Sequence, residues 1–334
     1  MKHDLKPPYL LFLGDGGPGA VAKTAEGIAF WRPELVVGEC AMPGADITVG
    51  MPVLSPADAA AQGAKSLVIG VAPNGGRISS GWIALLKQAL DHGLDIISGL
   101  HARLADIPAL AIHAAEVGRE LHDVRHPVAP IAVATGQRRS GKRILTVGTD
   151  CAVGKMFTSF ALEKEMRARG LRAHVCTTGQ TGIMISGKGI AIDAVVSDFV
   201  SGAAEQLAPA TDPDVWQIIE GQGSLFHPSF AGVTLGLVHG AQPDAMILCH
   251  SATRTHMFGL PDYPVPRLTA CIAAYESAAQ LTNPAAKVVA ISLNSKGLGS
   301  DAADAMAASF EQETGLVCVD PVRSGAQRLV NAAI

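Results

Sequence analysis

The sequence has few aromatic residues and little net charge of either sign. Phe, Trp and Tyr make up 4% of its 334 residues, and the formal net charge at pH 7 is −4. Proteins that bind single-stranded nucleic acid stack the bases on aromatic rings and carry basic surfaces, so both shortages argue against a nucleic-acid partner. The slight excess of acid also argues against binding to an anionic membrane surface.

Paired cysteines and long apolar runs are missing as well. The six cysteines show no CxxC or metal-like spacing, which predicts free thiols and no metal site. The apolar run at residues 9–13 is too short for a signal-peptide core, and no run is long enough to span a bilayer. We therefore expect a cytoplasmic protein without a membrane segment.

What the sequence does contain is a regular alternation of short apolar segments with helix-like segments, which predicts parallel α/β sheets. Helices are expected up to about residue 30 and at 56–62, 80–92, 157–169, 199–207, 268–280, 300–314 and 325–334. Strands are expected at residues 9–13, 35–38, 66–71, 95–98, 144–147, 173–176, 215–219, 245–249, 287–293 and 316–319. The proline-containing segment 261–266 is expected to be an irregular connection.

The length suits two domains. A basic, glycine-containing run at residues 137–142 precedes the strand at 144–147. We read this run as a linker between a Rossmann-like N-terminal domain (1–136) and a P-loop NTPase-like C-terminal domain (143–334). Such a charged run is usually solvated, although it could also face a phosphate.

The most informative stretch is the loop at 148–156, between an apolar strand and a helix start. Such a loop binds phosphate through its amides, the helix N-terminus and a lysine. The expected cofactor-binding residues are Gly148, Thr149, Asp150, Cys151, Ala152, Val153, Gly154, Lys155 and Met156. Against the common P-loop pattern, Gly148 stands one place early and Met156 replaces the Ser or Thr that would bind magnesium. The loop therefore indicates a phosphate binder and argues against magnesium-dependent nucleotide hydrolysis.

In the N-terminal half, polar residues follow predicted strands, where open α/β sheets gather ligands. Arg77 and His101 are the candidates for contact with a substrate. The alternative for each is a solvated arginine and a histidine that caps a loop.

In the C-terminal half, Glu220 follows the strand at 215–219 directly, where P-loop folds place a metal ligand or an acid that orients water. His227 is a second candidate for the general base, since imidazole titrates near neutral pH. Thr178 and Gln180 lie in a hydroxyl-rich loop after the strand at 173–176, which we expect beside the phosphate-loop strand. The alternative for His227 is a structural histidine, and the alternative for the loop that holds Thr178 and Gln180 is a flexible turn.

The strand at 245–249 leads into a loop rich in histidine, hydroxyl and arginine. Arg254 is expected to bind a substrate carboxylate, because guanidinium grips a carboxylate bidentately. Ser251 is a candidate for an oxyanion or substrate contact, as is Gln180. Cys151 is a possible nucleophile, but a small residue in a tight loop explains it more simply.

Residues 148–155, GTDCAVGK, resemble the modified phosphate loop of dethiobiotin synthetase, GTDTxVGKT, and Glu220 with Gly221 resembles that enzyme's acidic strand end. The order of a Rossmann-like half, this loop with its Gly-Lys-Met, EGQGSL from Glu220 and CHSATR from Cys249 is similar along the whole length to the DgcN family. That family was formerly a domain of unknown function and is associated with D-glutamate N-acetyltransferases.

The resemblance implies transfer of an acetyl group from acetyl-CoA to the amino group of D-glutamate, in a catabolic route that a partner enzyme completes on the N-acetyl product. Met156 fits this reading, since the phosphates of coenzyme A need no magnesium-ligating hydroxyl. We expect no metal. A homo-oligomer is expected because symmetric assemblies are common. The alternative function is an ATP- and magnesium-dependent ligase or kinase of the dethiobiotin synthetase type, using Lys155 and Glu220.

Overall fold

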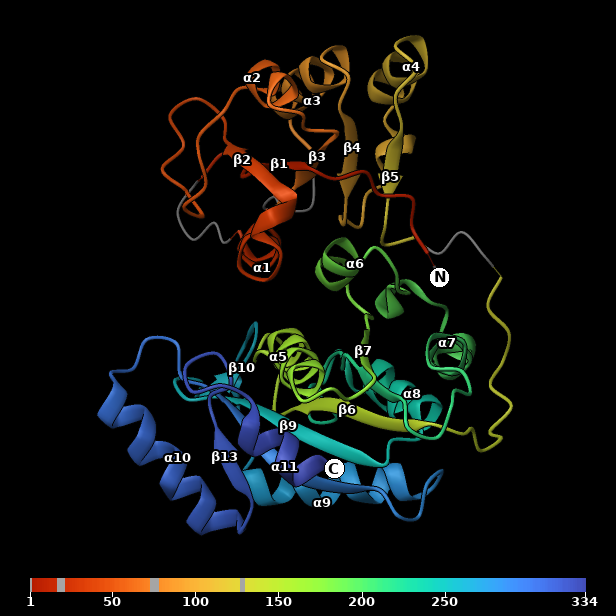
Figure 1. Cartoon of the computed structure of the whole chain (residues 1–334), viewed down its shortest axis with the longest axis vertical. Helices are drawn as coiled ribbons and strands as arrows, with labels where there is room; N and C mark the ends of the chain where they lie inside the picture. Colours follow the sequence, from red (N-terminus) through yellow and green to blue (C-terminus); the bar gives the residue numbers. More distant parts are fainter. Residues whose placement is uncertain (1, 17–21, 73–77, 127–129) are drawn as a thin grey trace. The chain divides into compact units, whose positions relative to one another are not determined.

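The computed structural model describes residues 2–16, 22–72, 78–126 and 130–334. The chain divides into two compact units (Figure 1). The N-terminal unit holds the described residues of 2–126 together with Gln180–Ala191, and the C-terminal unit holds 130–179 and Ile192–Ile334. A segment from the second half of the chain therefore packs into the N-terminal unit.

The N-terminal unit is built on a five-stranded parallel sheet in the order β2-β1-β3-β4-β5. Its strands are β1 (Tyr9–Phe12), β2 (Val36–Cys40), β3 (Ser66–Ile69), β4 (Asp95–Ser98) and β5 (Leu121–Asp123). The helices are α1 (Lys23–Trp31), α2 (Pro56–Ala61), α3 (Ser80–Asp91), α4 (Pro108–Glu116) and α6 (Gln180–Ser186), with short 3₁₀ turns at Pro33–Leu35 and Leu104–Asp106. Strands β1, β3 and β4 are buried along their whole length, which explains the apolar residues of β1 and at the centres of β3 and β4.

The C-terminal unit is built on a six-stranded parallel sheet in the order β13-β12-β9-β6-β8-β7. Its strands are β6 (Lys142–Gly148), β7 (Ala173–Cys176), β8 (Trp216–Ile219), β9 (Ala245–Ser251), β12 (Lys287–Asn294) and β13 (Val317–Val319). Strand β6 lies centrally, and the chain continues first on the β8 side and later on the β9 side. This reversal is the point where open α/β sheets bind ligands, and the phosphate loop begins there.

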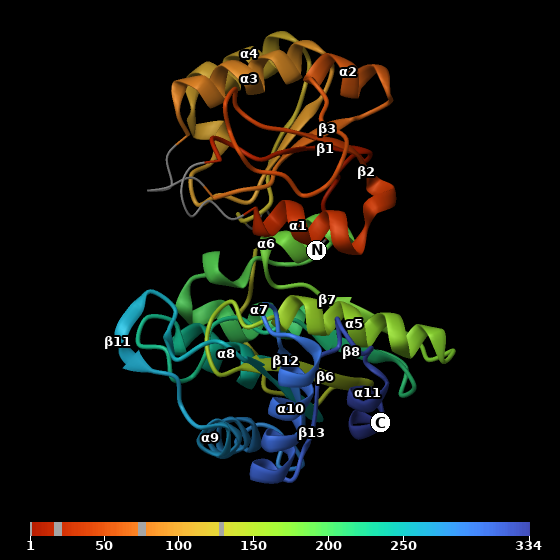
Figure 2. The ribbon, with the colours of Figure 1, turned by 90° about the vertical axis from the view of Figure 1, so that its left-hand side faces the viewer.

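Helices cover both faces of this sheet. Figure 2 shows α5 and α11 on one side of it and α8 and α9 on the other. The helices are α5 (Lys155–Ala168), α7 (Val200–Leu207), α8 (Ala231–Ala241), α9 (Leu268–Gln280), α10 (Ser300–Thr314) and α11 (Gln327–Ala333), with 3₁₀ turns at Ile192–Ala194 and Ser197–Phe199. A separate antiparallel hairpin, β10 (His256–Met257) with β11 (Leu260–Pro264), follows β9. No helix of the described chain is both long and apolar enough to cross a bilayer.

The parallel α/β architecture predicted for both halves is confirmed. Three local expectations were wrong. Strand β7 is not a neighbour of β6, because β8 lies between them. The segment 261–266, expected as an irregular connection, contains most of β11. His250 and Ser251, expected in a loop, are the last two residues of β9.

Candidate active site

The phosphate loop joins the buried end of β6 to the first turn of α5. Ala152 and Gly154 have φ angles of 54° and 104°, so the chain bends there into the left-handed region. Successive left-handed and right-handed residues turn backbone N–H groups towards a common point, which suits an anion. Gly154 is the N-cap residue of α5, so the helix dipole adds to this attraction.

Lys155 folds back over the loop. Its ammonium donates hydrogen bonds of 2.8 Å to the carbonyl oxygens of Asp150 and Gly223, and burial lowers its pKa. The neighbouring Gly221 has no room for a side chain, since a Cβ atom would lie 1.7 Å from the carbonyl oxygen of Thr146. The same Cβ atom would lie 3.2 Å from the Lys155 side chain, so the chain that follows β8 packs closely against the lysine. Lys155 and Glu220 therefore lie in one region.

The hydroxyls that follow Met156 on α5 are turned away from the loop. Thr158 donates to the Gly154 carbonyl and pairs with Ser292 at 2.8 Å. Ser159 donates to the Lys155 carbonyl and pairs with Thr146 at 3.1 Å. Neither hydroxyl therefore replaces the magnesium ligand that Met156 lacks.

Asp150 is fully buried within the phosphate loop and holds the β10–β11 hairpin. One carboxylate oxygen accepts hydrogen bonds from Arg254 Nη1 at 2.6 Å and from the Phe258 amide at 2.7 Å, and the other accepts from the Cys151 amide. Arg254 is 23% exposed, so this ion pair is largely shielded from water. The arginine that the sequence assigns to a substrate is brought to the phosphate loop by an acid 104 residues away.

Glu220 is buried at the end of β8 without a direct ion pair among the described contacts. One carboxylate oxygen accepts hydrogen bonds from the amides of Thr178 and Gly179 at 3.0 and 3.3 Å. Burial raises its pKa to about 7, because desolvation of the charged form outweighs these hydrogen bonds and the attraction of Lys155. A carboxyl group with this pKa exchanges protons near neutral pH.

Thr178 and Gln222 complete the surroundings of Glu220. The Thr178 hydroxyl donates to the Glu220 carbonyl at 2.6 Å and accepts from the Gln222 side chain at 3.1 Å. Thr178 therefore contacts Glu220 through both its amide and its hydroxyl.

His227 is buried and has partners for both ring nitrogens. Nδ1 accepts a hydrogen bond from the Ser229 amide at 3.1 Å, so the proton of the neutral ring sits on Nε2, which donates to the Phe258 carbonyl at 3.0 Å. Phe258 is thus held at its amide by Asp150 and at its carbonyl by His227.

The other predicted residues are placed separately. Thr149 pairs with His250 Nδ1 at 3.0 Å, and burial lowers the pKa of His250 to about 4, which keeps that ring neutral. Ser251 is buried at the end of β9. Gln180 begins α6 and belongs to the N-terminal unit, where it packs against Gly99. Arg77 lies outside the described residues.

Sequence reasoning missed two residues that hold this site together. Tyr275 is fully buried on α9, and its hydroxyl donates to the Gly148 carbonyl at 2.8 Å and accepts from the Leu225 amide at 3.2 Å. Phe258 is the second, at the hairpin. A tyrosine among small residues in a helix reads as core, so only its buried hydroxyl, which needs a partner, signals the contact.

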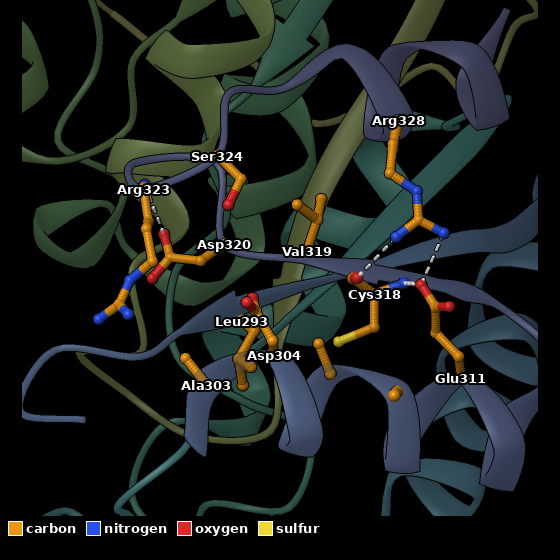
Figure 3. A pocket seen from close by; sticks show the side chains of 12 residues that line it. Leu293, Ala303, Asp304, Glu311, Cys318, Val319, Asp320, Arg323, Ser324 and Arg328 are labelled. Atoms are coloured by element: carbon orange, nitrogen blue, oxygen red, sulfur yellow. Dashed lines mark hydrogen bonds and ion pairs between the residues drawn. The ribbon is translucent and has the colours of Figure 1, made fainter. Parts of the chain in front are cut away.

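A pocket of about 280 Å³ lies elsewhere in the C-terminal unit, beside the edge strand β13 (Figure 3). There the Cys318 amide donates to Glu311, the Cys318 carbonyl accepts from Arg328, and Arg328 pairs with Glu311 at 2.8 Å. Side chains thereby satisfy the outer hydrogen-bonding groups of the strand, which protects the edge from pairing with another chain. None of the predicted site residues lines this pocket.

Family models match both halves of the chain. One, described as a domain of unknown function, DUF1611_N Rossmann-like domain, matches residues 36–127, and another, DUF1611_C P-loop domain, matches residues 131–330. The chain belongs to the DUF1611 family. A crystal structure of a DUF1611 family protein from Anabaena variabilis aligns with a TM-score of 0.89 at 36% identity, over 98% of this chain and 99% of that one. The predicted fold class is confirmed for this DUF1611 chain.

Curated relatives of this DUF1611 protein are named as enzymes. A D-glutamate N-acetyltransferase from Tritonibacter scottomollicae is 51% identical over 328 residues, 98% of each chain. A D-glutamate N-acetyltransferase from a Pseudoalteromonas species is 45% identical over 326 residues, again 98% of each chain. The family resemblance inferred from the phosphate loop and the strand-end motifs is therefore confirmed.

Proposed function

We propose that the protein is a D-glutamate N-acetyltransferase that uses acetyl-CoA. The observation that carries the proposal is its full-length similarity to two enzymes of that name, at 51% and 45% identity. A phosphate loop without a magnesium-ligating hydroxyl supports coenzyme A as the donor, since its phosphates can be bound by loop amides and Lys155 alone.

In the proposed reaction Glu220 is the general base. Its carboxylate takes a proton from the D-glutamate ammonium, and the free amine attacks the thioester carbonyl. In the tetrahedral intermediate the nitrogen loses its second proton to water. Collapse then breaks the carbon–sulfur bond, and the first proton passes from Glu220 to the coenzyme A thiolate, which leaves as the thiol. Glu220 is preferred to His227 because both nitrogens of the histidine already bind backbone groups. The predicted catalytic role of Ser251 is as a donor to the oxyanion.

The substrate carboxylates are assigned to Arg254 and, outside the described residues, to Arg77. Asp150 uses one nitrogen of Arg254, and a guanidinium carries five N–H donors, so capacity for a substrate carboxylate remains. Thr178 and Gln180 stay proposed substrate contacts, although the contacts of Thr178 also suit a role in positioning Glu220.

Direct transfer is preferred to an acetyl-cysteine intermediate. Burial raises the pKa of the Cys151 thiol, which keeps it protonated and weakly nucleophilic. Donor atoms of Asp150, Cys151 and His227 lie within 4.8 Å of one another. However, Asp150 and His227 are engaged with Arg254 and Phe258, so we propose that the reaction needs no metal.

We further propose a cytoplasmic homo-oligomer, linked in function to an enzyme that acts on N-acetyl-D-glutamate. The domain boundary at 137–142 also stays a proposal, and limited proteolysis would test it by cutting there first.

The purified protein tests the function directly. With acetyl-CoA and D-glutamate we expect release of the coenzyme A thiol and a product heavier by one acetyl group in the mass spectrum. Parallel assays replace D-glutamate with L-glutamate, or supply ATP and magnesium with and without a chelator. Product that requires ATP and disappears with the chelator would instead establish the ligase or kinase alternative.

A further inference from the structure

Two exposed phenylalanine residues, Phe258 and Phe230, lie beside residues that contact the phosphate loop. The chain has only 15 aromatic residues, from 9 Phe, 3 Trp and 3 Tyr. The exposed ones are Phe30, Phe230, Phe258 and Tyr263, and all but Phe30 belong to the C-terminal unit. Leaving a large apolar ring in water forgoes part of the stabilisation that burial gives, so exposed rings at one place suggest a ligand that covers them.

Phe258 and Phe230 are held in place by the contacts of the phosphate loop itself. Phe258 is fixed at its amide by Asp150 and at its carbonyl by His227, while the residue stays 49% exposed. Phe230 is 43% exposed, and its ring lies 4.6 Å from that of His227. Both phenylalanine residues therefore contact His227, Phe258 through its backbone carbonyl and Phe230 through its ring.

A charged side chain lies near each of the two phenylalanine residues. The Arg254 guanidinium lies over the Phe258 ring at 5.7 Å, while the same arginine pairs with Asp150. Next to Phe230, the Gly223 carbonyl accepts a hydrogen bond from Lys155. A ligand whose phosphates occupy the loop would thus lie near residues that contact both phenylalanines, Asp150 for Phe258 and Gly223 for Phe230.

We propose that Phe258 and Phe230 form a stacking platform for the adenine ring of the acyl donor. This inference rests on the proposed function for the identity of the donor. A phosphate anchor flanked by exposed rings and a guanidinium matches a ligand with a purine base close to its phosphates. Base–aromatic stacking contributes about 1–3 kcal/mol for each base, which corresponds to roughly a 5- to 150-fold change in affinity.

Calorimetric titration with three probes tests the platform. The probes are coenzyme A, adenosine 3′,5′-bisphosphate and inorganic pyrophosphate. Phe258→Leu keeps an apolar side chain but removes the aromatic face, so it should weaken binding of coenzyme A and the bisphosphate about tenfold and leave pyrophosphate unchanged. Phe258→Trp should bind like the wild type, and Phe30→Leu, which removes an exposed ring of the N-terminal unit, is the matched control.

Three results would overturn the platform. The first is unchanged binding of the bisphosphate to Phe258→Leu. The second is an equal loss of pyrophosphate binding, which would mean that the substitution damages the loop. The third is a change in the mass of the assembly, measured by light scattering, which would mean that Phe258 contacts another copy of the protein. A kinetic comparison with acetyl-pantetheine, which lacks the nucleotide, tests the stacking platform and the proposed function separately. Equal KM values for acetyl-pantetheine and acetyl-CoA would contradict the platform but not the proposed function. Bisphosphate binding that depends on Phe258, without any acetyl transfer, would contradict the proposed function but not the platform.

Discussion

Asp150 and Glu220 are both buried carboxylates near the phosphate loop, yet their partners differ. Asp150 accepts hydrogen bonds from Arg254 and from the amides of Cys151 and Phe258. Glu220 accepts from the amides of Thr178 and Gly179, and burial raises its pKa to about 7. A nearby guanidinium compensates the charge of Asp150, whereas backbone dipoles compensate that of Glu220 only in part.

The difference separates two tasks within one site. The ion-paired carboxylate of Asp150 holds structure in place, here the hairpin that carries Phe258. A carboxyl group that is desolvated without a contacting cation can gain and lose a proton near neutral pH, which is what a general base requires.

Replacing the proposed base should have the largest effect. Glu220→Gln keeps an oxygen for the amides of Thr178 and Gly179 but cannot accept the substrate proton, so we expect kcat to fall about 10²- to 10⁴-fold. Steady-state kinetics with acetyl-CoA and D-glutamate measure it. The matched control is Glu39→Gln, since Glu39 is also buried at a strand end and accepts hydrogen bonds from the amides of Val49 and Met51. Similar losses in both variants would contradict the special role of Glu220.

The raised pKa of Glu220 also predicts how stability depends on pH. Its pKa in the folded protein is about 7 against an ordinary value of 4.5, so the folded state binds more protons between these pH values. The contribution of Glu220 to the free energy of unfolding is therefore fully present below about pH 4.5 and declines as pH rises to 7, by up to about 3 kcal/mol. Urea unfolding at pH 5 and pH 8 should show Glu220→Gln gaining on the wild type at the higher pH. A constant difference would place the pKa elsewhere.

Removing the charge of Asp150 should mainly cost stability. Asp150→Asn removes the charge that pairs with Arg254, and its single amide oxygen can replace only one of the two accepting oxygens, either the one that binds Arg254 and Phe258 or the one that binds Cys151. Breaking a fully buried pair costs about 3–5 kcal/mol, and because Arg254 is partly exposed we expect about 2 kcal/mol. Urea unfolding checks this value, with Asp214→Asn at the surface pair with Arg172 as the control. An unchanged stability would show that the ion pair does not hold the hairpin.

The smallest effect is expected at His227. Gln at this position can still donate to the Phe258 carbonyl, so His227→Gln should lower stability by about 1 kcal/mol and change kcat less than tenfold. The pH profile of kcat/KM should keep its rise near pH 7, since Glu220 is still present. Loss of that rise would transfer the role of general base to His227.

Much of the fold could be predicted because its signals are local. The strands at 95–98 and 173–176 and the helices at 268–280 and 300–314 have the observed bounds. Strand β5 and helices α4 and α8 were not anticipated. β5 has three residues, two of them polar, and pairs only along β4, so its own sequence lacks the apolar pattern of a buried strand.

The site divides in the same way. Phosphate loop and strand-end acid are recognisable from residues that are adjacent in sequence, because each depends on a strand, a turn and a helix start. The β10–β11 hairpin was not recognisable from the sequence, since Pro261 and Pro264 suggest an irregular connection. Its contacts with the site run from Phe258 to Asp150 and His227, which are distant in sequence.

The sequence by itself determined that the chain forms parallel α/β sheets, predicted a phosphate-binding loop at 148–156 and placed an acid after the strand of residues 215–219. Only the tertiary structure decided which acid is ion-paired and which is buried without a contacting cation. Burial and the approach of Arg254, distant in sequence from Asp150, set the electrostatic environment of each carboxylate, and neither can be read from neighbouring residues.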